Sequence, residues 1–166
     1  MIDVLFTKEE CERIIDYTKF LKKRRQTPSS DRFVSYEHYT LELNDNTSWV
    51  YQRLNSYLEK ITKTTVIKNV DRIMINKYII GDGFEKHQDL YFKNQTFNVA
   101  IHLNDEYEGG DFVFYEPNYI MPKIIGCSYV FENTRWHEVQ KVLSGERWSM
   151  IAFYTRDNIK PENKLM

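Results

Sequence analysis

Apolar residues recur at helical spacing in two stretches near the start of the chain. The first stretch begins at Thr7, which forms a capping box with Glu10. Its core-facing positions fall on one helical face: Cys11, Ile14, Ile15, Thr18 and Leu21. The second stretch begins at about Thr47, and its apolar positions are Val50, Leu54, Tyr57, Leu58 and Ile61. We therefore expect two helices within about residues 7–61, each with one face packed on a core.

From about Thr65 the pattern changes to short runs of β-branched and aromatic residues. Turn-forming residues interrupt these runs at Gly81-Asp82-Gly83, Gly109-Gly110, Pro117-Asn118 and Ser144-Gly145. Residues 33–43 are also rich in β-formers, and residues 26–31 form a loop between the first helix and this segment. The expected fold is α+β and mainly β: a double-stranded β-helix, or jelly roll, over about 65–156, with the two N-terminal helices packed on it.

Length and charge narrow the class of protein. A chain of 166 residues is long enough for one substantial core and too short for two, so we expect a single domain over 1–166. Its formal net charge of −1 gives no overall attraction for nucleic acid or an anionic membrane, and we expect neither partner. The one basic run, Lys22-Lys23-Arg24-Arg25, is interpreted as the solvated end of the first helix rather than as a phosphate site.

Two features bear on the compartment. Cys11 and Cys127 both lie on apolar-patterned segments, which favours two buried free thiols. The sequence has no signal-peptide pattern and no apolar span of 18 residues. We therefore expect a soluble, reducing compartment such as the cytoplasm.

The candidate chemistry begins with His87-Gln88-Asp89. Alternate side chains of a β-strand point the same way, so His87 and Asp89 can bind one cation together. A third ligand must come from elsewhere in the fold, and His137 is the candidate. Two imidazoles and one carboxylate leave other coordination positions open, as in non-haem Fe(II) oxygenases. A single His beside Trp136 would more often be a packed or surface residue, but the ordered set favours a metal site.

A candidate anion receptor follows His137. Arg147 lies ten residues later, and its planar guanidinium suits a carboxylate bidentately. Ser149 shares its strand face and adds a hydroxyl donor. Taken alone, Arg147 would more often be a solvated charge. After the metal-site residues it predicts a receptor for a dicarboxylate co-substrate.

From about Ile73 to Tyr154 the chain resembles the Fe(II)/2-oxoglutarate-dependent dioxygenase superfamily, and most of all its prolyl 4-hydroxylase branch. The matching residues are Tyr78, Gly81, Phe84, His87-Gln88-Asp89, Thr96, Leu103-Asn104, Gly109-Gly110, Pro122, Gly126, His137 and Gly145-Glu146-Arg147. The opening segment 5–11 also resembles the start of that domain. The resemblance thus covers about half of the chain closely.

The resemblance implies an Fe(II) enzyme that uses 2-oxoglutarate and O2, releases succinate and CO2, and hydroxylates a C–H bond. Its implied metal ligands are His87, Asp89 and His137. The residues implied in 2-oxoglutarate binding are Arg147, Tyr78, Ser149 and His102. For His102 a second role stays open, that of a polar group behind the co-substrate. Ascorbate (L-ascorbic acid) is implied as the reductant.

For the substrate, the resemblance implies a prolyl residue in a protein or peptide. The residues implied in substrate binding are Phe84, Tyr91, Gln95, Trp136 and Phe153. Two of them depart from the branch's pattern, because Phe84 stands where Tyr is common and Gln95 stands where Arg is common. Both departures weaken the prolyl assignment.

Two alternatives stay open. The first is a dioxygenase that acts on a small molecule or a nucleobase. A demethylase of nucleic-acid bases would carry a further Arg where this chain has Phe153, and the basic surface that such an enzyme needs is absent from the composition. The second is a non-catalytic jelly-roll binding module, which the presence of all three ligands and Arg147 disfavours.

Overall fold

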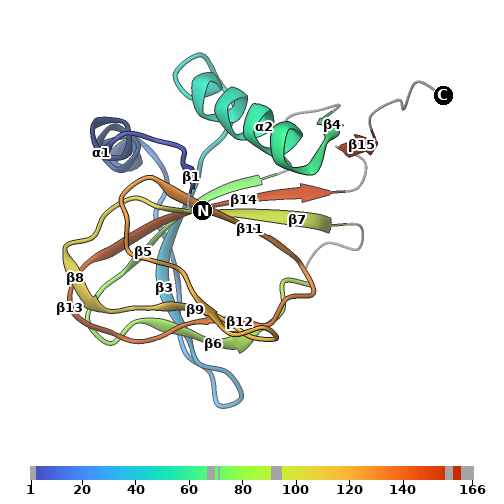
Figure 1. The fold of residues 1–166 in the computed structure, drawn as a ribbon. Helices are drawn as coiled ribbons and strands as arrows, with labels where there is room; N and C mark the ends of the chain where they lie inside the picture. Colours follow the sequence, from blue (N-terminus) through green and yellow to red (C-terminus); the bar gives the residue numbers. More distant parts are fainter. Residues whose placement is uncertain (1–2, 67–69, 71, 91–94, 156–158, 162–166) are drawn as a thin grey trace.

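The computed structural model describes residues 3–66, 70, 72–90, 95–155 and 159–161. Helices α1 (Lys8–Tyr17) and α2 (Ser48–Thr62) lie together on one side of a curled β-structure, as Figure 1 shows. A short 3-10 helix, η1 (Thr18–Phe20), follows α1. In the described ranges, no helix combines the length and the apolar character that crossing a membrane requires.

One antiparallel sheet of eleven strands forms most of the fold. Its order is β1 (Asp3–Val4), β11 (Cys127–Glu132), β7 (Gln95–His102), β14 (Arg147–Thr155), β5 (Arg72–Tyr78), β3 (Val34–Thr40), β6 (Gly83–His87), β12 (His137–Val139), β9 (Phe112–Phe114) and β10 (Tyr119–Ile120). Strand β2 (Arg24–Gln26) pairs with β3 off this path. Because the sheet curls so that β6, β12 and β9 face the strands around β14 (Figure 1), the expected jelly roll is confirmed.

Two small sheets complete the fold, one of β8 (Tyr107–Gly109) with β13 (Val142–Gly145) and one of β4 (Thr64–Val66) with β15 (Ile159–Pro161). In the first of them Gly109 and Gly110 have φ of +70° and +61°, values that favour glycine, as the sequence predicted for this turn. A Cβ on Gly110 would lie 3.1 Å from Cδ of Arg147, so this glycine also lets the turn approach that side chain.

Local sequence explains where the helices begin. Thr7 accepts a hydrogen bond from the backbone N–H of Glu10 (3.1 Å), and the Glu10 carboxylate accepts one from the Thr7 N–H (3.0 Å). The predicted capping box is therefore confirmed. Helix α1 ends at Tyr17, earlier than the pattern through Leu21 suggested, because the chain tightens into η1 and then extends.

The basic run is exposed, as expected, but it does not end a helix. Since η1 ends at Phe20, residues 22–25 lie beyond the helix, and Arg24 and Arg25 enter β2. The Arg25 guanidinium binds both oxygens of Asp82, at 2.6 and 3.2 Å. Arg24, on the alternate face of the strand, pairs in register with His38 of β3. The second half of the run is thus part of the sheet rather than of a helix end.

The central strands separate two cores because alternate side chains point to opposite faces. On β14, Met150, Ala152 and Tyr154 pack with the buried faces of α1 and α2. The intervening Ile151 and Phe153 belong to a second cluster on the inner face of the curl. Cys11 and Cys127 are buried free thiols, as expected. The helices therefore stabilise one face of the sheet, and the other face is left to form the site.

Candidate functional site

Three potential metal ligands converge on the inner face of the curl. His87 ends β6 and His137 begins β12, and the two residues are register partners in this antiparallel pair. Asp89 lies two residues beyond His87, just past the end of β6. One ligand atom from each residue fits within a group whose members are all within 4.8 Å of one another. Nε2 of His87 and of His137 lie 3.3 and 3.4 Å from the Asp89 oxygens. The sequence prediction that these three side chains meet is confirmed.

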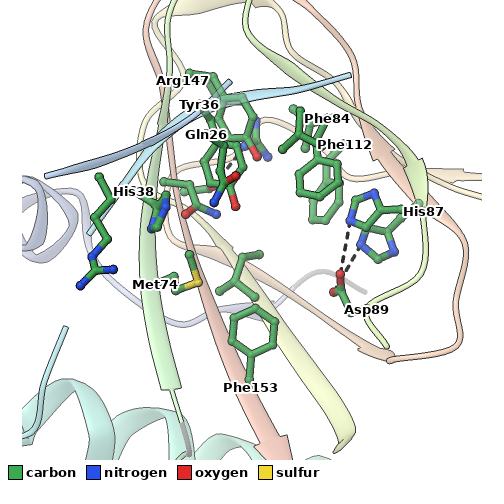
Figure 2. Close-up of a pocket in the computed structure, with 18 of the residues that line it drawn as sticks. Gln26, Tyr36, His38, Met74, Phe84, His87, Asp89, Phe112, Arg147 and Phe153 are labelled. Atoms are coloured by element: carbon green, nitrogen blue, oxygen red, sulfur yellow. Dashed lines mark hydrogen bonds and ion pairs between the residues drawn. The ribbon is translucent and has the colours of Figure 1, made fainter. Parts of the chain in front are cut away.

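The protein itself orients these ligands. Nδ1 of His87 contacts the Glu85 carbonyl oxygen at 2.6 Å, and Nδ1 of His137 contacts the Arg135 carbonyl oxygen at 2.7 Å. A carbonyl can only accept, so each Nδ1 carries a proton and Nε2, the nitrogen that faces Asp89, is left as the metal-binding atom of each ring. This ring orientation is the one that a metal at Nε2 requires, and Figure 2 shows His87 and Asp89 facing each other.

Charge states at the triad also suit a divalent cation. Burial lowers the pKa of His87, which favours the neutral imidazole that binds metals. Burial opposes ionisation of Asp89, but hydrogen bonding to His137 and His87 outweighs it and lowers the pKa of Asp89 to about 2. Asn98 of β7 donates to Asp89 at 2.7 Å and holds the carboxylate in place. Two imidazoles that present Nε2 and one carboxylate therefore fit Fe(II) with open positions left for other ligands.

Arg147 lies in the same cavity, at the start of β14. It is 1% exposed, and its guanidinium donates to the Ser149 hydroxyl at 3.1 Å. The guanidinium carbon lies 5.2 Å from the ring centre of Tyr78, its register partner on β5. Nε and Nη2 have no hydrogen-bond partner, and Arg147 forms no ion pair with any residue in the described ranges. A buried cation without a counter-ion is costly, so the geometry calls for an anionic ligand.

His102 lies behind this group rather than in the cavity wall. It is a register partner of Ser149 and is fully buried. Burial, reinforced by the charge of Arg147, lowers the pKa of His102 to about 3. The imidazole is therefore neutral near neutral pH, and both roles implied for it stay predictions.

The cavity that joins these groups has a volume of about 590 Å³. Of the residues expected to bind substrate, Phe84 and Phe153 line it, and Figure 2 shows them on different sides of the space. Trp136 is 42% exposed and is not part of the lining, because His137 points inward and strand alternation turns its neighbour outward. Tyr91 and the side chain of Gln95 lie outside the described residues.

The structure adds lining residues that the sequence did not single out. His38 of β3 and Asn76 of β5 are 6% and 8% exposed, and both line the cavity. Arg24, Arg32 and Arg72 also line it, and the Arg32 guanidinium lies 4.9 Å from the ring centre of Phe84. No spacing rule in the sequence brings His38 next to Asn76. Their juxtaposition follows from the pairing of β3 with β5.

Comparison with known proteins agrees with this geometry. The family model for the 2OG-Fe(II) oxygenase superfamily matches residues 73–155. That segment contains the His-Asp-His cluster and Arg147. No protein of curated function matches the sequence.

Solved structures share the fold at low sequence identity. An oxidoreductase of the 2OG-Fe(II) oxygenase family from Burkholderia pseudomallei superposes with a TM-score of 0.78 at 20% identity, over 97% of this chain and 85% of that one. A prolyl-4-hydroxylase from Pseudomonas putida gives 0.73 at 12%, over 92% and 89%. A prolyl hydroxylase from Trichoplax adhaerens, in complex with a peptide fragment of the hypoxia inducible factor oxygen degradation domain, gives 0.73 at 13%, over 95% and 84%.

Proposed function

Because the chain belongs to the 2OG-Fe(II) oxygenase superfamily, we propose that it is an Fe(II)- and 2-oxoglutarate-dependent hydroxylase of prolyl residues in a protein or peptide. The observation that carries the co-substrate assignment is Arg147, a buried and unpaired cation in the same cavity as the His-Asp-His cluster. A ligand with two carboxylates can reach both, one end at the metal and the other at the guanidinium.

The residues of the chain divide the work between binding and orientation. His87, His137 and Asp89 would hold Fe(II). When bound, the metal supplies O2 activation and the oxidation of a substrate C–H bond, with 2-oxoglutarate converted to succinate and CO2. Arg147 and Ser149 would grip the distal carboxylate of 2-oxoglutarate.

Two further groups would shape the co-substrate site. Tyr78 is 2% exposed and lies under the guanidinium, where its hydroxyl would add a donor to the distal carboxylate. Burial raises the pKa of Tyr78, so the hydroxyl keeps its proton. Phe112 packs 5.5 Å from the guanidinium on another side and excludes water from it. The electrostatic attraction between guanidinium and carboxylate is therefore screened little.

Support for a prolyl substrate comes from the cavity and from the structural neighbours. Phe84 and Phe153 present apolar rings to the space beside the metal cluster, a suitable contact for a proline ring. Prolyl hydroxylases are among the proteins that share the fold, and the one from Trichoplax adhaerens is described with a peptide. An extended, proline-containing peptide is already close to its bound conformation, which lowers the cost of binding in a groove.

Mass spectrometry tests this proposal. Proline-containing peptides incubated with the protein, Fe(II), 2-oxoglutarate and ascorbate, the proposed reductant, should gain about 16 Da on proline, as one inserted oxygen requires. The Asp89→Ala variant should give no product. If varied peptides stay unmodified while a free amino acid or a nucleobase is turned over, the prolyl assignment is wrong and a small-molecule dioxygenase replaces it.

A further inference from the structure

Five neighbouring strands each place a polar residue at one shared register position on the inner face of the sheet. Across β7, β14, β5, β3 and β2 the row consists of His102, Ser149, Asn76, His38 and Arg24. Ser149 and His102 lie at the Arg147 end and belong to the proposed co-substrate site. The other three residues continue the row away from it, and no role has yet been given to them.

Asn76 and His38 require a ligand. They are register partners on β5 and β3, and both line the cavity. Although each is more than nine-tenths buried, Oδ1 of Asn76 and Nδ1 of His38 have no hydrogen-bond partner. Two adjacent orphaned polar atoms inside a cavity are each destabilising by about 1–3 kcal/mol. A bound polar group that contacts both would remove this cost.

The charges around these two residues are positive. Arg24 is the register partner of His38, and Arg72 also lines the cavity. Burial lowers the pKa of His38, and the charges of Arg72 and Arg24 lower it further. Neither arginine takes part in an ion pair within the described part of the chain. By contrast, the neighbouring Arg25 is paired with Asp82.

The positive charges of Arg24 and Arg72 are not needed to balance the charges of the proposed metal and co-substrate site. Asp89 and the two carboxylates of 2-oxoglutarate supply three negative charges, and Fe(II) with Arg147 supplies three positive ones. The loaded catalytic end is therefore neutral. Among the lining residues, Arg24 and Arg72 then remain without a compensating carboxylate in the lining. Since the whole chain carries a net charge of −1, this positive region is local rather than general.

We infer that the wall formed by β2, β3 and β5 binds a carboxylate of the substrate, with Arg24 and Arg72 as its cationic partners and His38 and Asn76 as neutral contacts to the adjoining polar group. The inference rests on the proposed function, because it names the substrate class of the same cavity. In a peptide substrate, an acidic side chain next to the target proline supplies the carboxylate. In a free amino acid the α-carboxylate would supply the same chemistry.

Equilibrium binding to the loaded protein tests the inference without relying on turnover. The probes are three labelled peptides that differ only in the residues flanking a single proline, which are Glu, Gln or Lys. With Mn(II) and 2-oxoglutarate bound under anaerobic conditions, fluorescence anisotropy should show about tenfold tighter binding of the Glu peptide than of the Gln peptide. This preference should shrink as salt is added, because the attraction is electrostatic and lies at an exposed mouth.

Variants assign the effect to the wall. The double variant Arg24→Gln, Arg72→Gln should bind the Glu and Gln peptides equally. Lys23→Gln is the matched control, since it neutralises an exposed neighbour of Arg24 that does not line the cavity, and it should keep the preference. The double variant Arg24→Lys, Arg72→Lys conserves the charge and should keep most of the preference for the Glu peptide. Thermal unfolding of each variant checks that the fold is intact.

A second arm separates the two sources of carboxylate. Free L-proline is compared with L-prolinamide in the same protein and in the double variant. If a carboxylate preference appears only between L-proline and L-prolinamide, and the double variant loses it, the wall binds the carboxylate of free amino acids. The inference is overturned if neither arm shows a carboxylate preference, or if the double variant retains it. Substrate-independent succinate release from 2-oxoglutarate, measured on the same preparation with Fe(II), reports on the proposed function separately.

Discussion

At the metal end of the cavity, the polar atoms that face away from the ligand position are held by the protein itself. His87 and His137 each bind a backbone carbonyl, and Asn98 donates to Asp89. At the other end the same sheet leaves buried polar atoms without partners, on Arg147, His102 and Asn76 among others. One cavity thus combines an end that the chain completes alone with an end that only ligands can complete.

This difference teaches which part of the site is preorganised. Fixed imidazole tautomers and a held carboxylate mean that metal binding requires little rearrangement. An unpaired buried guanidinium, in contrast, destabilises the empty protein, and a bound anion relieves that cost. We therefore expect metal affinity to depend on the residues that hold the metal ligands in place as well as on the ligands themselves. Co-substrate affinity should depend on the residues that contact the co-substrate. Four variants test this contrast.

The largest expected effect is that of Asp89→Ala. This change removes the one anionic residue of the cluster and leaves two imidazoles to hold a divalent cation. Because loss of a mere supporting partner already weakens metal affinity by about 10–100-fold, loss of a ligand should weaken it by more than about 100-fold. Iron content after dialysis and succinate production measure the outcome. A variant that retains both would remove Asp89 from the metal site.

Arg147→Ala should have the next largest effect, and only on the co-substrate. We expect 2-oxoglutarate binding to weaken by about 2–4 kcal/mol, because one carboxylate loses its buried partner. Mn(II) or Fe(II) affinity should stay unchanged, since the guanidinium is not among the metal ligands. Calorimetric titration of the metal-loaded protein with 2-oxoglutarate gives the value. Unchanged affinity would mean that the anion receptor lies elsewhere.

Asn98→Ala tests the support of the metal end. The Asn98 amide donates to Asp89 at 2.7 Å, so its loss frees the carboxylate to rotate. We expect metal affinity to fall by about 10–100-fold with all three ligands present. Asn55→Ala is the control, since Asn55 accepts a hydrogen bond from Tyr154 on the helix-facing side of the sheet. Equal metal affinity in the two variants would show that the network around Asp89 is not needed.

The smallest expected effect is on the pH dependence of stability. The pKa of His102 is about 3 in the folded protein and about 6.5 in the unfolded chain, mainly because of burial. Between these values the unfolded state binds a proton that the folded state does not, so this residue lowers stability as pH falls below about 6.5. One such proton contributes a slope of about 1.4 kcal/mol per pH unit.

Between about pH 6.5 and pH 5, the free energy of unfolding of the His102→Gln variant should therefore fall less steeply than that of the wild type. The difference in slope should be up to about 1.4 kcal/mol per pH unit. Denaturant unfolding of the metal-free protein at several pH values measures it. His38, whose pKa is also lowered by burial, stays in the variant and serves as an internal reference. An unchanged slope would contradict the buried, neutral state of His102.

The sequence predicted the metal ligands and Arg147 because they form an ordered set of short motifs, and within each motif the spacing limits the geometry. His87 and Asp89 are two apart, and Arg147 and Ser149 repeat that spacing. The capping box at Thr7 was equally predictable, since its two hydrogen bonds are local. The capping box and the Arg147–Ser149 pair depend on nearby residues alone, whereas His137 reaches His87 through the pairing of β12 with β6.

The polar row could not be predicted in the same way. Asn76 and His38 are 38 positions apart in sequence and meet because β3 pairs with β5, with α2 between them in the chain. Arg24 was assigned to a helix end because the 3.6-residue pattern continued through Leu21, but tertiary pairing of β2 with β3 overrides it. The sequence implied Trp136 in substrate binding, but its side chain does not line the cavity. The face of the sheet to which it points depends on where β12 begins.

The place of β2 in the sheet has a consequence for how this site can diversify. β14 is constrained on both faces, one by the helices and one by the cavity, so most substitutions along it disturb either the core or the chemistry. β2 pairs only with β3 and carries exposed residues. Changes at Arg24 and Gln26 can therefore alter which molecules enter while leaving the catalytic end intact. In a directed-evolution library, randomising β2 should yield a larger share of folded, altered-specificity variants than randomising β14.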